Sequence, residues 1–243
     1  MALKDEFSEL YRREHALHFT PERTTLEVDT LVAALTLRPH ERVLDLGCGW
    51  GRHLTELKQR GFTGLVGIDV QGAFLEPVDG VTMLAGDAGA LEFENEFDAV
   101  YCAFNALFSA PDAAPKVFAS VARALKPGGR FLLDTANRER LAVADPTRSW
   151  RGGGDLPWLL EETRFNLLTG AQEIFQRRIF TGSYTETDHT ETLTLTRYHY
   201  TLSDLTRLLQ THELTVTDVY GDWTLNPYTA QSPRLLLLTR KEV

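Results

Sequence analysis

In Val43-Leu-Asp-Leu-Gly-Cys-Gly-Trp-Gly51 a largely apolar run is followed by three closely spaced glycines, a pattern typical of a strand that turns into a helix. Glycines at 47, 49 and 51 let a strand turn sharply and bring its backbone against a ligand before a helix starts. A lone glycine-rich turn can also simply join a strand to a helix. However, Asp69 ends the next apolar run 18 residues after Gly51, close to the spacing of about 20 at which an acidic side chain meets ribose hydroxyls.

Alternating apolar runs continue on both sides of this turn. Two N-terminal helices are predicted, one over 3–19 and one that starts at Thr20-Pro21 and ends at Arg38-Pro39. Helical spacing is also present over 51–60 and before 125. The order strand, helix, strand is typical of a parallel sheet with helices on its faces. We predict strands over 42–46, 65–69, 81–84, 98–102 and 130–134.

The pattern changes at Trp150, where residues 151–155 contain three glycines and suggest a flexible stretch. Thr169-Gly170 then separates two strand-like runs and suggests a two-residue hairpin turn. These features predict an inserted antiparallel β-cap over residues 150–200, after the fifth strand. Its three predicted strands are Leu159–Leu168, Ala171–Phe180 and 191–200.

The sheet pattern resumes after this insert. Ser203 is predicted to cap a short helix, followed by strands over 214–220 and 234–239 with no helix between them. The predicted fold class is therefore α/β, a doubly wound seven-stranded and mostly parallel sheet with an antiparallel last strand. We expect one domain over residues 1–243, in which residues 1–37 form helices that contribute to a lid.

Composition narrows the function. The 243 residues carry 25 basic and 34 acidic side chains, a net charge of -9, and the basic residues form no long cluster. This balance disfavours nucleic acid and favours a small-molecule partner. The two cysteines form no CxxC pair, so no metal site or disulfide is expected and a reducing cytoplasm fits. A charged N-terminus and the lack of a long apolar run predict a cytoplasmic protein without a membrane segment.

Five ordered segments resemble the class I S-adenosylmethionine-dependent methyltransferases. They are VLDLGCGWG at 43–51, GIDV at 67–70, AGDAGAL at 85–91, FDAVYCAF at 97–104 and LKPGGRFLLD at 125–134. The resemblance implies that S-adenosylmethionine is the cofactor and S-adenosylhomocysteine the product. It implies methionine contacts from the glycine turn, ribose contacts from the second segment and adenine contacts from the third. The cofactor-binding residues implied are Tyr11, Asp45, Gly47, Cys48, Gly49, Gly51, Asp69, Val70, Asp87, Ala88 and Ala103.

The resemblance also implies an in-line displacement that moves a methyl group to a small-molecule acceptor. Such a reaction needs alignment and exclusion of water more than it needs catalytic side chains. A base helps only when the acceptor has to lose a proton. Weak candidates for that base are His199, His18 and Tyr11, which lie in the segments expected to cover the acceptor. The nature of the methylated atom and the oligomeric state are left open.

Three other functions share part of this sequence pattern. A nicotinamide-dependent dehydrogenase needs a third glycine at position 52, where this chain has Arg52. An RNA methyltransferase is disfavoured by the acidic balance. A non-catalytic S-adenosylmethionine-binding protein with the same fold stays open, because sequence alone does not distinguish binding from transfer.

Overall fold

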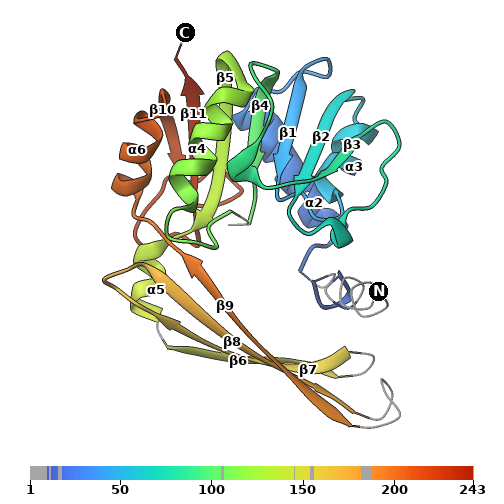
Figure 1. Ribbon diagram of the computed structural model, residues 1–243, viewed down its shortest axis with the longest axis vertical. Helices are drawn as coiled ribbons and strands as arrows, with labels where there is room; N and C mark the ends of the chain where they lie inside the picture. The colour runs from blue at the N-terminus through green and yellow to red at the C-terminus, as the bar shows by residue number, and fades with distance from the viewer. Residues whose placement is uncertain are drawn as a thin grey trace.

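The computed structural model describes residues 10, 12–15, 18–104, 107–144, 146–153, 156–181 and 188–242. Figure 1 shows two layers of strands, a large central sheet with helices on both faces and a smaller sheet beyond one end of it. Of the predicted first helix, residues 10 and 12–15 are helical. Most of that helix, including Tyr11, lies outside the described residues.

The central sheet has seven strands in the order β10-β11-β5-β4-β1-β2-β3. β1 pairs in parallel with β2 and β4, whereas β11 runs antiparallel to both β5 and β10. This arrangement confirms the predicted fold class. The strands are β1 Arg42–Leu46, β2 Gly64–Asp69, β3 Thr82–Ala85, β4 Phe97–Cys102, β5 Leu125–Ala136, β10 Leu214–Tyr220 and β11 Arg234–Lys241.

Alternate residues of β1 pack into two separate hydrophobic cores, one on each face of the sheet. Val43 packs with α2 (Pro21–Ala34) and α3 (Arg52–Gln59), and Leu44 packs on the opposite face with α4 (Ala113–Ala124) and α6 (Leu202–Gln210). A strand buried on both faces reads as a continuous apolar run, as Val43 to Leu46 does apart from Asp45. The shorter elements are η1 Gly72–Phe74, η2 Ala88–Ala90 and α5 Arg138–Ala144.

Among the helix and strand bounds that differ from the prediction, two have an evident local cause. α2 ends at Ala34 and not at Arg38, because the chain leaves the helix through Thr36 in the left-handed region, with φ of 48°. β5 starts at Leu125, which pairs with Phe97, and not at the predicted residue 130, and the register with β4 is irregular between these positions. Gly128 has φ of 73° there. Both differences arise from local glycine or cap geometry that hydrophobic periodicity does not detect.

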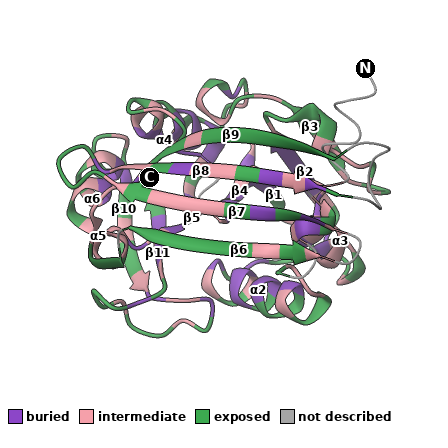
Figure 2. Ribbon diagram, turned by 90° about the horizontal axis from the view of Figure 1, so that it is seen from below, coloured by how far each residue is buried: buried purple, intermediate pink, exposed green. Residues whose placement is uncertain are grey.

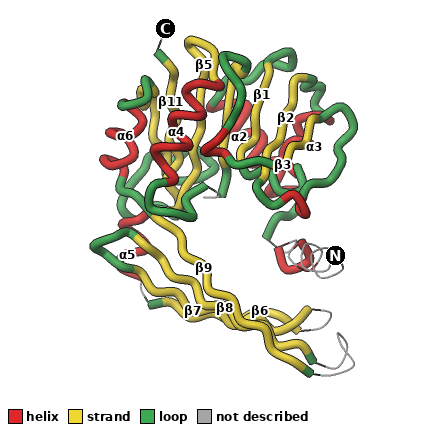
Figure 3. Tube along the Cα trace, viewed as in Figure 1, coloured by secondary structure: helices red, strands yellow, loops and turns green. Residues whose placement is uncertain are grey.

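The smaller sheet, called the cap below, is formed by β6 (Thr147–Gly153), β7 (Leu156–Phe165), β8 (Ala171–Phe180) and β9 (His189–Tyr198). The four strands pair antiparallel in chain order. β5 runs into α5 and then β6, so the cap lies at the carboxyl end of the parallel strands (Figure 3).

Two details of the cap correct the sequence prediction. Residues 151–153, predicted as flexible, belong to β6, a fourth strand whose polar and glycine-rich sequence hides it from an apolar pattern. The connection between β7 and β8 spans 166–170 and not two residues. Asn166 Oδ1 accepts hydrogen bonds from the backbone N–H groups of Leu168 and Thr169, and this contact widens the turn.

The two faces of the cap have different surroundings. Leu159 is buried, and Arg178 forms a buried double hydrogen bond with Glu14 of the N-terminal segment, at 2.9 and 2.8 Å. These side chains alternate with Trp158 and Leu160, which are exposed. Figure 2 shows this sheet from below, with mostly exposed residues along β6 and β9. One face of the cap therefore packs toward the central sheet and the other faces outward.

No helix in the described part of the chain is both long and apolar enough to cross a membrane.

α6 allows a test of how its N-terminus is stabilised. The cap residue is Thr201 and not Ser203, because the Thr201 hydroxyl accepts from Asp204 N–H and the Asp204 carboxylate accepts in return from Thr201 N–H. We expect Thr201→Ala to lower the free energy of unfolding by about 1 kcal/mol in urea denaturation. Ser203→Ala is the matched control and should have a much smaller effect. Equal losses of unfolding free energy in both variants would contradict the assignment of Thr201 as the N-cap of α6.

Candidate functional site

The glycine turn after β1 takes a backbone path that side chains rarely allow. Gly47, Gly49 and Gly51 have φ of 75°, 54° and 80°. Gly47 N and Cys48 N both donate to Ile68 O, at 2.8 and 3.1 Å, which fixes the turn against β2. A Cβ added at Gly49 would meet no atom within 4 Å. The turn therefore leaves open space next to exposed backbone, as a ligand cradle requires.

Asp69 at the end of β2 holds the same turn from the other side. Its Oδ2 accepts from Gly49 N at 2.9 Å and its Oδ1 accepts from Gln71 N at 2.8 Å. A carboxylate has about four acceptor positions, so two remain for hydroxyl groups of a ligand. The sequence motif and the acidic strand end are thus joined directly.

Two neighbouring cavities lie at the carboxyl ends of the strands. The larger, of about 360 Å³, is lined by residues from the glycine turn, the ends of β2 and β4, and the cap strand β9. The smaller, of about 150 Å³, shares Gly47, Asp69 and Val70 with it and adds Asp87 and Ala88. The predicted residues brought together in these cavities are Asp45, Gly47, Cys48, Gly49, Asp69, Val70, Asp87, Ala88 and Ala103.

Two predicted cofactor residues are placed differently. Gly51 is the N-cap of α3 and is not among the described residues that line the two cavities. Its conformation serves the start of the helix, so its contribution is to the turn and not to the wall. Tyr11 lies outside the described residues.

Asp45 is 2% exposed and lies in the wall of the larger cavity. Its Oδ2 accepts from the Tyr101 hydroxyl at 2.9 Å. Burial raises the pKa of Asp45 to about 7, and the negative charge of Asp69 adds to this, while the Tyr101 hydrogen bond and the positive charge of Arg52 oppose it. Burial also raises the pKa of the Cys48 thiol, which makes it a packing residue and not a nucleophile.

The structure adds a cluster that the sequence prediction missed. Arg52 and His53 of α3 line the larger cavity, and both contact the buried carboxylate of Glu27 on α2. Burial lowers the pKa of His53 to about 4, so the ring is neutral at pH 7. The rings of Phe19, Trp50 and Phe104 complete this wall. The one sequence feature that could have indicated this cluster was Arg52, which occupies the position of the third glycine in a dinucleotide-binding turn.

The candidate bases lie apart from these walls. His199 is buried, its Nε2 is 3.0 Å from Gln172 Oε1, and burial together with Arg197 lowers its pKa to about 4. His18 is exposed, and its backbone carbonyl accepts from Arg23 Nη1. Neither histidine is among the described residues that line the two cavities, although Arg197, two residues before His199, is.

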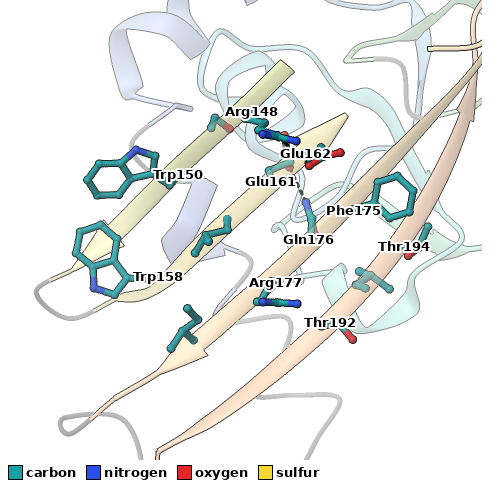
Figure 4. Close-up of a pocket in the computed structure, with 14 residues that line it drawn as sticks. Arg148, Trp150, Trp158, Glu161, Glu162, Phe175, Gln176, Arg177, Thr192 and Thr194 are labelled. Atoms are coloured by element: carbon teal, nitrogen blue, oxygen red, sulfur yellow. Dashed lines mark hydrogen bonds and ion pairs between the residues drawn. The ribbon is translucent and has the colours of Figure 1, made fainter. Parts of the chain in front are cut away.

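A third hollow, of about 650 Å³, lies on the cap. Trp150 and Trp158 project side by side there, with ring centroids 5.2 Å apart, and Arg177 lies further along the same face (Figure 4). It shares none of its described lining residues with the two cavities at the glycine turn. The motif residues therefore direct attention to the strand ends and not to this larger hollow.

A doubly wound sheet with cavities at its strand ends and a glycine turn defines a Rossmann-like α/β ligand-binding protein. Comparison with known proteins narrows this class. Residues 43–129 match the family model described as a methyltransferase domain. The cypemycin N-terminal methyltransferase of a Streptomyces species is 29% identical over 216 residues, which cover 82% of this chain and 83% of that protein.

Solved structures agree on the fold. The sugar N-methyltransferase KedS8 from a Streptoalloteichus species has a TM-score of 0.72, with 15% identity over 90% of this chain and 88% of that one. CalS10, an amino pentose methyltransferase from Micromonospora echinaspora solved with S-adenosylmethionine bound, has a TM-score of 0.68 and 17% identity, covering 95% and 96%. Residues 43–129 are a methyltransferase domain, so the chain is an enzyme, and its sequence and fold are similar to those of class I S-adenosylmethionine-dependent methyltransferases.

The unusual carboxyl of Asp45 has a measurable consequence. The folded protein keeps a proton on Asp45 up to about pH 7, whereas the unfolded chain releases it near 3.8. Stability from this group is therefore lost as the pH rises between these values. We expect the free energy of unfolding of the wild type minus that of Asp45→Asn to fall from pH 4 to pH 7. Urea denaturation at several pH values measures this difference.

The comparison cancels the opposite contributions of His53 and His199, which are present in both proteins. The charged and titrating groups facing Asp45 are Arg52, Asp69 and the Tyr101 hydroxyl, and these are also unchanged. A difference that stays flat across this range would show that Asp45 is ionised at acidic pH.

Proposed function

We propose that this enzyme binds S-adenosylmethionine across the two joined cavities and transfers its methyl group to an amine nitrogen of a small molecule. The supporting observation is that both cavities share Gly47, Asp69 and Val70. A ligand with a nucleoside at one end and an amino acid at the other suits two compartments that meet at a ribose-binding carboxylate. The open space next to Gly49 can accommodate part of such a ligand.

Each motif segment receives a role in this proposal. Asp69 and Val70 hold the ribose, and Asp87 and Ala88 at the start of η2 hold the adenine edge. The methionine end lies against Asp45, Gly47, Cys48, Gly49 and Ala103. When bound, the cofactor supplies an electrophilic methyl group on a positively charged sulfur.

The cap and the N-terminal segment are proposed to form the lid over the acceptor. Leu195, Thr196 and Arg197 of β9 line the same cavity as the glycine turn, which supports this role. The buried Glu14–Arg178 pair ties the N-terminal segment to the cap. A covered site excludes water and holds the acceptor in line with the methyl group.

The names of two similar proteins support nitrogen as the methylated atom, since one is named for N-terminal methylation and one as a sugar N-methyltransferase, and a third is named as an amino pentose methyltransferase. An unprotonated amine attacks the methyl carbon through its lone pair while the carbon–sulfur bond breaks. The positive charge moves from sulfur to nitrogen, and the excess proton then leaves to water. This reaction requires no strong base. The role of His199 or His18 as a general base therefore stays a prediction that the proposed reaction does not need.

Two alternative functions, methylation of RNA and cofactor binding without catalysis, predict different behaviour in solution. The net charge of -9 supports a small acceptor over RNA, and a non-catalytic protein would bind the cofactor without transfer. Cys48 and Cys102 do not form a disulfide with each other, which fits a reducing compartment such as the cytoplasm.

Binding of S-adenosylhomocysteine by calorimetry tests the cofactor site. Asp69→Ala removes the ribose acceptor and also releases Gly49 N–H, so we expect binding to weaken by roughly 10- to 100-fold. Asp79→Ala changes an exposed aspartate near the same strand and should bind as the wild type does. Equal affinity of Asp69→Ala and wild type would contradict the assignment.

Transfer of a labelled methyl group tests the acceptor. We expect the wild type to methylate amino sugars or peptide N-termini and to leave the matched hydroxy analogues unlabelled, because an unprotonated amine is a stronger nucleophile than a neutral hydroxyl, which needs a base to remove its proton. Label on transfer RNA, with binding that falls steeply with salt, would instead favour the RNA alternative. Cofactor binding with no labelled product from either acceptor class would favour the non-catalytic one.

A further inference from the structure

Arg52 is the first residue of α3, at the position where a dinucleotide-binding turn has its third glycine. Its side chain reaches α2 across the wall of the larger cavity. Nη1 lies 2.5 Å from Glu27 Oε2 and donates to Thr24 Oγ1 at 3.0 Å. These contacts fix one edge of the guanidinium group.

Aromatic rings fix the plane of the same group. The guanidinium carbon of Arg52 lies 4.4 Å from the centre of the Phe19 ring and 5.0 Å from that of Phe104. A guanidinium stacked against rings in this way loses little freedom when it forms further hydrogen bonds. The side chain is therefore pre-organised.

The other edge of this guanidinium is unused. Arg52 Nη2 is buried and has no hydrogen-bond partner among the described residues, and the side chain is only 13% exposed. A buried donor without a partner costs about 1 to 3 kcal/mol, so such groups in folded proteins usually have a partner that the bare chain does not show. Because Arg52 also lines the cavity with Gly49, a ligand there can supply that partner.

The charges in this cluster also favour an anion. Glu27 is the carboxylate for two guanidinium groups, because Arg23 Nε donates to its Oε1 at 2.7 Å while Arg52 contacts its Oε2. His53 adds no charge at pH 7, since burial lowers its pKa. Two positive groups therefore share one buried negative group, and of the two it is Arg52, 13% exposed, that lines the cavity, whereas Arg23 is 40% exposed.

We infer that Arg52 Nη2 binds the carboxylate of the methionine end of S-adenosylmethionine. This inference rests on the proposed function and adds a residue to it. Arginine matches a carboxylate through its planar N–H groups, and a charge-assisted pair is stronger than a neutral hydrogen bond. In a dinucleotide fold the third glycine allows the helix to pack closely on the strand. Here Arg52 replaces it, and its side chain extends along the cavity wall instead.

Calorimetry with two ligands isolates the carboxylate contact. S-adenosylhomocysteine carries the group, and its decarboxylated analogue, the adenosyl thioether of propylamine, lacks only that group. We expect the wild type to prefer S-adenosylhomocysteine by roughly 10- to 100-fold. In Arg52→Gln this preference should nearly disappear, while affinity for the analogue changes little. Arg52→Lys keeps the charge but not the planar pair of donors and should retain part of the preference.

Arg60→Gln is the matched control, because Arg60 is the C-cap of the same helix and pairs with Glu56 and Asp29 instead of lining the cavity. It should keep the wild-type preference. If Arg52→Gln weakens both ligands by the same factor, or if the wild type shows no preference, the carboxylate assignment is wrong although the cofactor site stands. If the wild type binds neither ligand, the proposed function fails as well.

Discussion

The hydrogen bond from Gly49 N–H to the Asp69 carboxylate is the interaction on which the site depends. It joins the turn after β1 to the end of β2, two segments that the parallel register already aligns, with Leu46 opposite Ile68. Ile68 O accepts from two further N–H groups of the same turn. Because three contacts hold the turn to β2, neither segment can shift without distorting the cavity between them.

The two aspartates at the strand ends work in different environments, and this difference divides the site. Asp69 is partly exposed and bonded to two backbone N–H groups, so its remaining oxygen positions face the junction of the two cavities. Asp45 is buried, and its hydrogen bond comes from the Tyr101 hydroxyl. A cation brought near Asp45 would favour its ionised form, which links ligand binding to proton release.

The cap shows how an insertion can extend a sheet fold without altering its core. Leu195, Thr196 and Arg197 of β9 line the larger cavity at the glycine turn, while Trp158 and Leu160 of β7 are exposed. The N-terminal segment is attached to β8 through Glu14 and Arg178 and to the loop after β2 through Arg12 and Glu76. Segments far apart in sequence thus close around one set of strand ends, where an acceptor would be held.

Elements whose cause is local could be predicted from the order of the residues alone. Three glycines within nine residues predicted the turn, apolar runs predicted seven strands, and Thr20-Pro21 predicted the start of α2, because each depends on neighbours along the chain. It also predicted the motif residues that line the cavities. Polar strands without an apolar pattern, such as β6, escaped this reasoning.

Packing between distant segments sets which side chains meet across elements. The contact of Arg52 with Glu27, the burial of His199 beside Gln172 and the pairing of Tyr101 with Asp45 join residues that lie 25 to 56 positions apart in the sequence. Burial and hydrogen bonding set the charge of these groups, and both depend on packing between distant segments. The ligand cradle was therefore encoded locally, whereas the electrostatics of its walls arose from the fold.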